Sequence, residues 1–265
     1  MDYLKRDLAP ITKNAWEEID TRVSQIAKYT LTARKLVDVS GPLGFESGGV
    51  NTGRLKTPLT QTHSGVNFGI REIQPFIEIR KPFELNIWEL DNIDRGSKDI
   101  NLKSLEKATR QVSLFEDSTI YEGFDPGGVV GLSNNSSHKK VTMPETANEI
   151  LVEIANQVNN LRKSSVEGPY SLVLSKKLWL KLLKITEGYP ILEQLNEIIQ
   201  GKIIINHNQD TNMLLSGRGG DYELTQGTDI EVGYDGHSSE NVKLFLSHAF
   251  TFRVLSPESI IVFEA

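Results

Sequence analysis

The chain has 265 residues, long enough for one large or two medium domains with a real core. Its formal net charge of −6 argues against a nucleic-acid coat, because phosphate binding needs an excess of Lys and Arg. There is no cysteine, which excludes disulfides, thiolate metal sites and cysteine nucleophiles.

The N-terminal segment is charged and lacks the apolar core of a signal peptide, and no stretch is apolar for long enough to span a bilayer. We therefore expect a cytoplasmic protein without a membrane contact. Thr12 is a suitable N-cap for an amphipathic helix that runs to about Lys35. The apolar residues that define its buried face are Trp16, Ile19, Val23, Ile26 and Ala27.

Residues 44–71 are rich in Gly, Thr, Ser and Asn and have no helical periodicity. A stretch of this length without a core is uncommon inside a compact domain. The alternation over residues 53–57 predicts a two-stranded arm, and an isolated hairpin is only marginally stable in water. We expect the arm to lie on another copy of the chain; the alternative is a flexible surface loop.

Residues 74–96 are predicted to form one bent strand or a strand pair followed by a turn. Apolar side chains occupy odd positions from Ile77 to Ile87, which predicts one buried and one solvated face. Trp88 falls on the solvated face, together with Arg80. Such a ring either packs under a loop, anchors another subunit or stacks on a planar ligand, and a guanidinium suits either of the last two.

Helical spacing of apolar residues predicts a long helix over residues 101–121, ended by Gly123. A polar loop over residues 124–140 is the expected boundary to a layered block in which helices alternate with short buried strands up to residue 215. The last fifty residues have β character, with Val242 to Val254 as the longest strand.

Catalytic motifs are missing from the sequence. The five histidines, at 63, 138, 207, 237 and 248, show no zinc-motif spacing, and we expect none of them to lie in a cluster with carboxylates. We therefore predict no catalytic residue and no metal site. An arm, a long helix and two lobes without an active site suit a self-assembling protein.

The whole chain resembles the encapsulins, bacterial and archaeal shell proteins. The resemblance rests on an ordered series of segments: LKRDLAPIT, WEEID, RKLVDVSGPLG, IEIRKPFELNIWELDNIDRG, LFEDSTIYEG, EGPYSLVLS, GYP, SGRGGDYEL and FTFRVLSPESIIV.

The resemblance implies an α+β chain with the HK97-like fold of phage capsid proteins, preceded by an N-terminal helix. It divides the chain into five parts. These are the N-terminal helix and start of the peripheral domain (1–47), an extended loop (48–72), the peripheral domain with its spine helix (73–124), an axial domain (125–215) and the peripheral β segments (216–265).

The resemblance also implies a function. Short members of the family form the smallest (T=1) icosahedral shell, of 60 copies, around a cargo enzyme, commonly a dye-decolorising peroxidase or a ferritin-like iron oxidase. The cargo docks through a terminal targeting peptide, and the matching positions here are Arg34, Asp38, Asp229, Ile230 and Tyr234. The partners implied are thus further copies and a cargo protein, with no nucleic acid.

Two further expectations follow from the resemblance. Glu187, Gly188 and Tyr189 match the loop that lines the five-fold pore. Some encapsulins bind a flavin such as FMN on a Trp beside an Arg, and Trp88 and Arg80 match those positions, although the shell requires no cofactor.

Two alternatives remain. A prophage-type capsid protein that packages DNA would share the fold but would have an N-terminal arm in place of the helix, and would present a basic interior. A secreted bacteriocin or protease would need an export signal and an active site, and the sequence shows neither.

Overall fold

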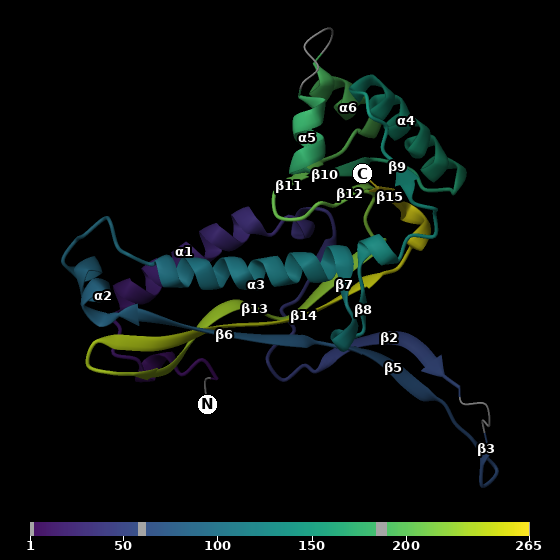
Figure 1. Cartoon of the computed structure of the whole chain (residues 1–265). Helices are drawn as coiled ribbons and strands as arrows, with labels where there is room; N and C mark the ends of the chain where they lie inside the picture. The colour runs from purple at the N-terminus through teal and green to yellow at the C-terminus, as the bar shows by residue number, and fades with distance from the viewer. Residues whose placement is uncertain (1–2, 58–61, 184–189, 265) are drawn as a thin grey trace.

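The computed structural model describes residues 3–57, 62–183 and 190–264. Two sheets form its framework, one of four and one of five strands. Helix α3 (Lys103–Glu122) runs along the four-stranded sheet, and the five-stranded sheet with its helices stands above the C-terminal half of α3 (Figure 1). The chain therefore mixes helix and sheet as an α+β fold, as predicted.

The four-stranded sheet has the order β1-β13-β14-β6. These strands are Asp38–Ser40, Tyr222–His237, Asn241–Val254 and Ile77–Asn86. Helices α1 (Lys13–Thr30), α2 (Ile87–Asp94) and α3 share a core with this sheet. Leu105 of α3, Ile19 of α1 and Leu244 of β14 are all fully buried in it. The helical periodicity of α1 and α3 exists because each presents one apolar stripe to this core.

The five-stranded sheet has the order β11-β10-β12-β15-β9. Its strands are Ile203–Asn206, Tyr170–Ser175, Asn212–Ser216, Ile260–Glu264 and Val141–Thr142. Helices α4 (Ala147–Lys163), α5 (Lys176–Leu182) and α6 (Ile191–Ile199) pack with one of its faces. The capping box of Thr146 and Glu149 fixes the start of α4.

The opposite face of the five-stranded sheet joins the two halves of the molecule. Side chains alternate across its strands: Leu214 packs with the helices α4–α6, while its neighbours Met213 and Leu215 pack with the C-terminal part of α3 and with β13 and β14. Because both faces of the central strands are buried, β10 is buried along its whole length. The two halves therefore share a continuous apolar contact.

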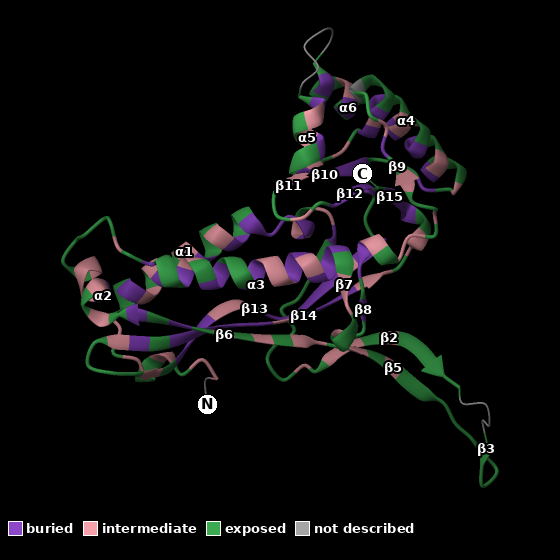
Figure 2. Cartoon of the chain, in the orientation of Figure 1, coloured by how far each residue is buried: buried purple, intermediate pink, exposed green. Residues whose placement is uncertain are grey.

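The arm predicted over residues 44–71 is present. Strands β2 (Gly49–Lys56) and β5 (Ile70–Pro75) pair in antiparallel fashion, and β3 (Thr62–His63) pairs with β4 (Val66–Asn67) near the tip. The arm projects from the body and is exposed along most of its length (Figure 2). It presents apolar side chains to solvent, namely Leu55, Val66, Phe68, Ile70 and Ile73.

Short elements complete the described chain. They are η1 (Arg6–Leu8), η2 (Ala33–Lys35), β7 (Gly123–Phe124), η3 (Asp125–Gly127), β8 (Val129–Val130), η4 (Leu132–Asn134) and η5 (Pro257–Ser259). Among the helices of the described residues, none is both long and apolar enough to cross a membrane.

Several sequence predictions are confirmed and three need correction. Thr12 caps α1 by accepting a hydrogen bond from the Ala15 N–H, as predicted, but α1 ends at Thr30 and a 3₁₀ turn follows. The strand after the arm ends at Asn86, whose side chain caps α2, so Trp88 lies on a helix and not on a strand face. The last strand, β15, pairs with β12 in the five-stranded sheet, although the sequence division at residue 216 grouped it with the peripheral β segments.

Gly123 ends α3 and generates a testable prediction. Its φ is +98°, and a Cβ there would lie 2.7 Å from the Gly131 nitrogen and 2.8 Å from the Val129 oxygen. Gly96 also has positive φ, but a Cβ there would meet nothing within 4 Å. We expect Gly123→Ala to lower the free energy of unfolding by about 3 kcal/mol or more, and Gly96→Ala by only about 1 kcal/mol.

The measurement is urea unfolding followed by tryptophan fluorescence at one fixed protein concentration. Equal losses in the two variants would show that the backbone contact at Gly123 contributes nothing beyond the positive φ.

Candidate functional site

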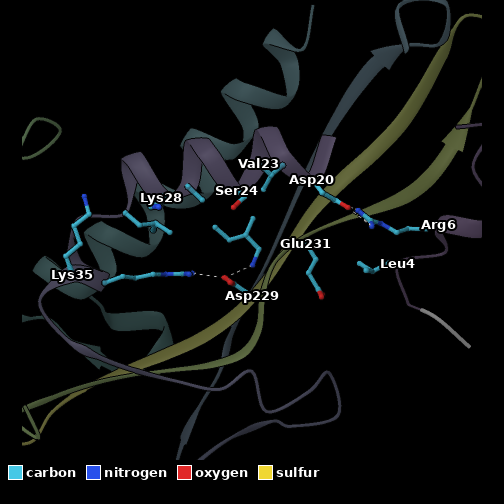
Figure 3. A pocket seen from close by; sticks show the side chains of 13 residues that line it. Leu4, Arg6, Asp20, Val23, Ser24, Lys28, Lys35, Asp229 and Glu231 are labelled. Atoms are coloured by element: carbon cyan, nitrogen blue, oxygen red, sulfur yellow. Dashed lines mark hydrogen bonds and ion pairs between the residues drawn. The ribbon is translucent and has the colours of Figure 1, made fainter. Parts of the chain in front are cut away.

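A cavity of about 650 Å³ lies between α1, the η2 turn and strand β13 (Figure 3). Helix α1 with the turn that follows it supplies one wall and the 229–231 part of β13 supplies the other, while the N-terminal segment closes one end. The lining residues are Leu4, Arg6, Asp20, Val23, Ser24, Ala27, Lys28, Leu31, Arg34, Lys35, Asp229, Ile230 and Glu231. We call this cavity the α1 pocket.

The α1 pocket has an apolar floor and charged edges. Val23 and Ala27 are buried on the inner side of α1, Leu31 is buried just after its end, and Ile230 faces them from β13. In Figure 3 Lys28 and Lys35 lie toward one end, while Arg6, Asp20 and Glu231 lie toward the other. Such a surface suits an extended peptide with apolar side chains between polar ones.

The N-terminal segment is held against β13. The Leu4 carbonyl accepts a hydrogen bond of 2.7 Å from the Tyr234 N–H, and the Arg6 Nε donates to the Val232 carbonyl at 2.9 Å. The Arg6 guanidinium also pairs with Asp20 of α1 and lies 4.3 Å from the centre of the Trp16 ring. These contacts connect β13 to α1 at this end of the pocket.

Arg34 lies between the two walls of the pocket. Its Nε and Nη2 bond the two carboxylate oxygens of Glu116 at 2.7 and 2.6 Å, and Nη2 lies 3.0 Å from Asp229 Oδ1. Burial alone would raise the pKa of Glu116, but Arg34 and His248 hold that pKa below its usual range. The pKa of Asp229 is lowered in the same way, because the charge of Arg34 outweighs partial burial.

Three of the five predicted docking residues line the α1 pocket: Arg34, Asp229 and Ile230. Asp38 does not; its carboxylate accepts a hydrogen bond from the Gly220 N–H and borders a different cavity. The Tyr234 side chain is buried and contacts His237, so it does not line the pocket. Its backbone N–H instead holds Leu4, which does line the pocket. Their part in peptide docking stays a prediction.

The sequence prediction for the histidines is wrong at one position. His248 is fully buried and its Nε2 lies 2.7 Å from Glu116 Oε2, so it does belong to a cluster with carboxylates. Glu116, Asp117 and His248 were all missed. In the described residues no group of three or more His, Asp and Glu has a geometry that could hold a metal ion.

Trp88 and Arg80 lie apart within one chain. Arg80 stacks on the Phe245 ring at 3.6 Å and lies 3.4 Å from Asp235, and about 20 Å of strand separates it from Asn86, at roughly 3.3 Å per residue. Trp88 is 68% exposed in the first turn of α2, so it does not pack under a loop. The two residues of one chain therefore do not fit a common flavin, and a site that used both would need a second copy.

The predicted pore loop, Glu187 to Tyr189, lies outside the described residues.

Comparison with known proteins extends over nearly the whole chain. Residues 1–251 match the family Linocin_M18, described as an encapsulating protein for peroxidase. The chain is 37% identical to a type 1 encapsulin shell protein of Mycobacterium tuberculosis over 260 residues, with 98% of each chain covered. A shell protein of the same description from Brevibacterium linens is also 37% identical, over 261 residues.

Three further similarities are more distant. A ferritin-like-encapsulin shell fusion protein of Pyrococcus furiosus is 26% identical over 79% of this chain and 58% of its own. A virus-like particle from Pyrococcus furiosus is similar in structure, with a TM-score of 0.66 at 20% identity over 94% of this chain and 99% of the other. The capsid of the Myoviridae phage XM1 has a TM-score of 0.58 at 12% identity, over 89% and 92% of the two chains. These likenesses confirm the predicted HK97-like capsid fold.

Asp117 generates a prediction on pH. Burial raises its pKa to about 6, despite hydrogen bonds from Thr32 and Ala33, whereas an unfolded Asp titrates near 3.9. Between pH 3.9 and pH 6 Asp117 is mostly protonated in the folded chain and mostly ionised in the unfolded chain. Its protonation therefore stabilises the folded state at low pH, and this stabilisation is lost as the pH rises through about 6. We expect the free energy of unfolding of the wild type, relative to Asp117→Asn, to fall by on the order of 1 kcal/mol between pH 5 and pH 7.

The measurement is urea unfolding of both proteins at the two pH values. Parallel pH dependences of the wild type and Asp117→Asn would contradict the raised pKa.

Proposed function

The chain belongs to the family of encapsulating proteins for peroxidase, the encapsulin shell proteins, and from this premise we propose that it forms a nanocompartment around a cargo enzyme. The observation that carries the proposal is the family match over residues 1–251, together with 37% identity to a shell protein over 98% of both chains. The family and these relatives are named for a structural role, in agreement with the prediction that the chain is not an enzyme.

Assembly into a shell of identical copies agrees with the shape of the chain. A two-stranded arm with exposed Leu55, Ile70 and Ile73 is marginal by itself and gains stability by lying on a neighbouring copy. We propose the smallest icosahedral shell, of 60 copies, because short members of the family build it. Closed symmetric assembly is the common outcome for a chain whose contacts with its neighbours repeat.

We propose that the α1 pocket binds the targeting peptide of the cargo. Apolar side chains of an extended peptide would pack on Val23, Leu31 and Ile230, and the charged edges would fix its direction. Arg34 would border the peptide from one wall and Asp229 from the other. The predicted contribution of Asp38 and Tyr234 is then indirect, through the positions of β1 and β13.

The cargo we propose is a peroxidase, of the dye-decolorising kind, or a ferritin-like iron oxidase. The family description names a peroxidase, and one relative is a fusion with a ferritin-like protein. The compartment would lie in the cytoplasm, with small ions and substrates entering through a five-fold pore bordered by Glu187, Gly188 and Tyr189. No nucleic acid and no membrane is part of this proposal.

A phage-type capsid protein is the second candidate. The phage capsid resembles this chain at 12% identity, which concerns the fold alone. The helix α1 and the net charge of −6 favour a compartment over a container for DNA. The secreted bacteriocin or protease receives no support from the family match or from the relatives.

The proposed assembly generates a prediction about the arm. We expect the purified chain to form uniform hollow particles of about 1.8 MDa, sixty times the chain mass of 29.7 kDa. The double variant Leu55→Ser and Ile70→Ser removes apolar contact area from the arm and should leave folded small oligomers. The measurement is size-exclusion chromatography with mass photometry and negative-stain microscopy.

Arg54→Gln is the matched control, because it changes an exposed polar residue on the same hairpin. Full particles from the double variant would show that the arm is not an assembly contact. A wild type that stays monomeric under all conditions would refute the shell itself.

The exposed Trp88 ring generates a prediction about flavin binding. We propose that the exposed Trp88 ring stacks on a flavin such as FMN, with the Arg80 of another copy as the second contact. Particles saturated with FMN should then keep yellow absorbance after gel filtration, and Trp88→Ala should lose it. Tyr29→Ala is the control, because Tyr29 is an exposed aromatic residue on α1. Trp179→Ala would not serve, because the Trp179 ring packs against the core. Equal flavin retention by the wild type and Trp88→Ala would refute this site.

A further inference from the structure

Three ionisable side chains lie directly behind the α1 pocket and line none of its surface. They are Glu116 and Asp117 in the C-terminal half of α3 and His248 in β14, with exposed fractions of 0%, 1% and 0%. Buried charges are costly unless they are fully paired. Their partners belong to the two walls of the pocket.

Asp117 holds the turn after α1, which belongs to the first wall of the pocket. Its Oδ2 accepts hydrogen bonds from the Thr32 N–H at 2.9 Å and from the Thr32 hydroxyl at 2.6 Å, and its Oδ1 accepts one from the Ala33 N–H at 3.0 Å. Arg34 is the next residue of this turn. One carboxylate of α3 thus fixes the backbone that carries Arg34 to the pocket.

Glu116 and His248 connect this turn to β13, which forms the second wall. Glu116 bonds Arg34 through both oxygens and also accepts from His248 Nε2. The other ring nitrogen, Nδ1, donates to the Thr228 carbonyl at 2.7 Å. Thr228 lies where the pairing of β13 with β14 is irregular, and Asp229 and Ile230 follow it. His248 therefore anchors the irregular backbone that presents Asp229 and Ile230 to the pocket.

Each charged group of the cluster has a partner. Both partners of the His248 ring are acceptors, so both ring nitrogens must donate and the ring carries a positive charge when both bonds form. Two cations, Arg34 and His248, then face the carboxylates of Glu116 and Asp229. Asp117 is the remaining carboxylate, which leaves one negative charge in excess, and it is satisfied by three hydrogen bonds, from the Thr32 N–H, the Thr32 hydroxyl and the Ala33 N–H. A buried network with every member paired is rigid.

We propose that Glu116, Asp117 and His248 are positioning residues of the α1 pocket, which set the separation of its two walls and thereby its affinity for a peptide that they cannot touch. This inference rests on the proposed docking function. A purely structural role would lower stability throughout the chain, whereas a positioning role predicts loosening at two defined segments, residues 32–35 and 226–231.

Hydrogen exchange of the assembled particle, followed by mass spectrometry, separates these roles. We expect Asp117→Asn to raise exchange at least about tenfold over residues 32–35, because an amide group cannot accept at both positions that the carboxylate oxygens occupy. His248→Phe keeps the stacking on Phe250 and removes both hydrogen bonds, so it should loosen residues 226–231. Glu116→Gln weakens the links to Arg34 and to His248 and should loosen both segments.

Asp221→Asn is the matched control. Asp221 is 3% exposed and its two oxygens bond Arg218 at 2.9 and 3.0 Å, but neither residue lines the α1 pocket. This variant should lower stability without faster exchange in the two segments. Uniform acceleration in all variants, or unchanged exchange in both segments, would overturn the proposal.

Peptide affinity provides the second readout, with a fluorescent copy of the terminal peptide from a peroxidase or ferritin-like protein encoded beside the shell gene. Glu116→Gln, Asp117→Asn and His248→Phe should each weaken binding about tenfold or more, and Asp221→Asn by less than about twofold. Wild-type affinity in the three variants would overturn the proposal. If wild-type particles bind no peptide, the docking function fails, while the exchange pattern still decides whether these residues position the two walls.

If any of these variants fails to fold, a smaller substitution at Thr32 still tests the contact with Asp117. Thr32→Val removes only the hydroxyl that donates to Asp117, and Thr32→Ser restores it. We expect faster exchange over residues 32–35 and weaker peptide binding in Thr32→Val, with rescue in Thr32→Ser. Indistinguishable behaviour of these two variants would overturn the part assigned to Asp117.

Discussion

The carboxylate of Glu116 is fully buried and has two cationic partners, Arg34 and His248, which come from opposite ends of the sequence. Removing one partner of such a buried pair typically costs about 3–5 kcal/mol, because the other charge stays buried and unpaired. The connection after α1 and the irregular part of β13 are therefore both fixed to the same point of α3. The α1 pocket lies between these two segments, so its shape depends on α3 although α3 forms none of its surface.

The order and type of most elements could be predicted from the sequence, because apolar periodicity records which face of each element is buried. The end of β6 could not. Ile87 continues the odd-numbered apolar pattern of the strand, while Asn86 is also a good helix N-cap, and only the contacts of α2 with the core decide between them. The place of β15 was equally hidden, because a strand of five residues does not encode which sheet it joins.

The candidate site was predicted in part. Arg34, Asp229 and Ile230 came from the family resemblance and meet at one pocket, but Glu116 and His248 were missed. A signal for them existed: Glu116 falls four residues after Val112 on the apolar stripe of α3, and His248 shares a strand face with Leu246 and Phe250. A charge at a core position needs a partner, and two such charges of opposite sign are natural partners. Periodicity shows that they are buried, whereas only the tertiary fold shows that they meet.

The two surfaces proposed here differ in what they require from other copies. Both walls of the α1 pocket come from one chain and are tied together by hydrogen bonds within that chain, so the pocket exists in each folded copy. The arm has the opposite character, because its apolar side chains face solvent and its strands pair mainly with each other. In the proposed assembly the arm would gain stability from a neighbour, and the stability of the whole would then depend on chain concentration, as in obligate assemblies. A change in the arm should thus act on assembly, and a change behind the pocket on recognition of the peptide, because no described hydrogen bond or ion pair links the arm to the buried cluster.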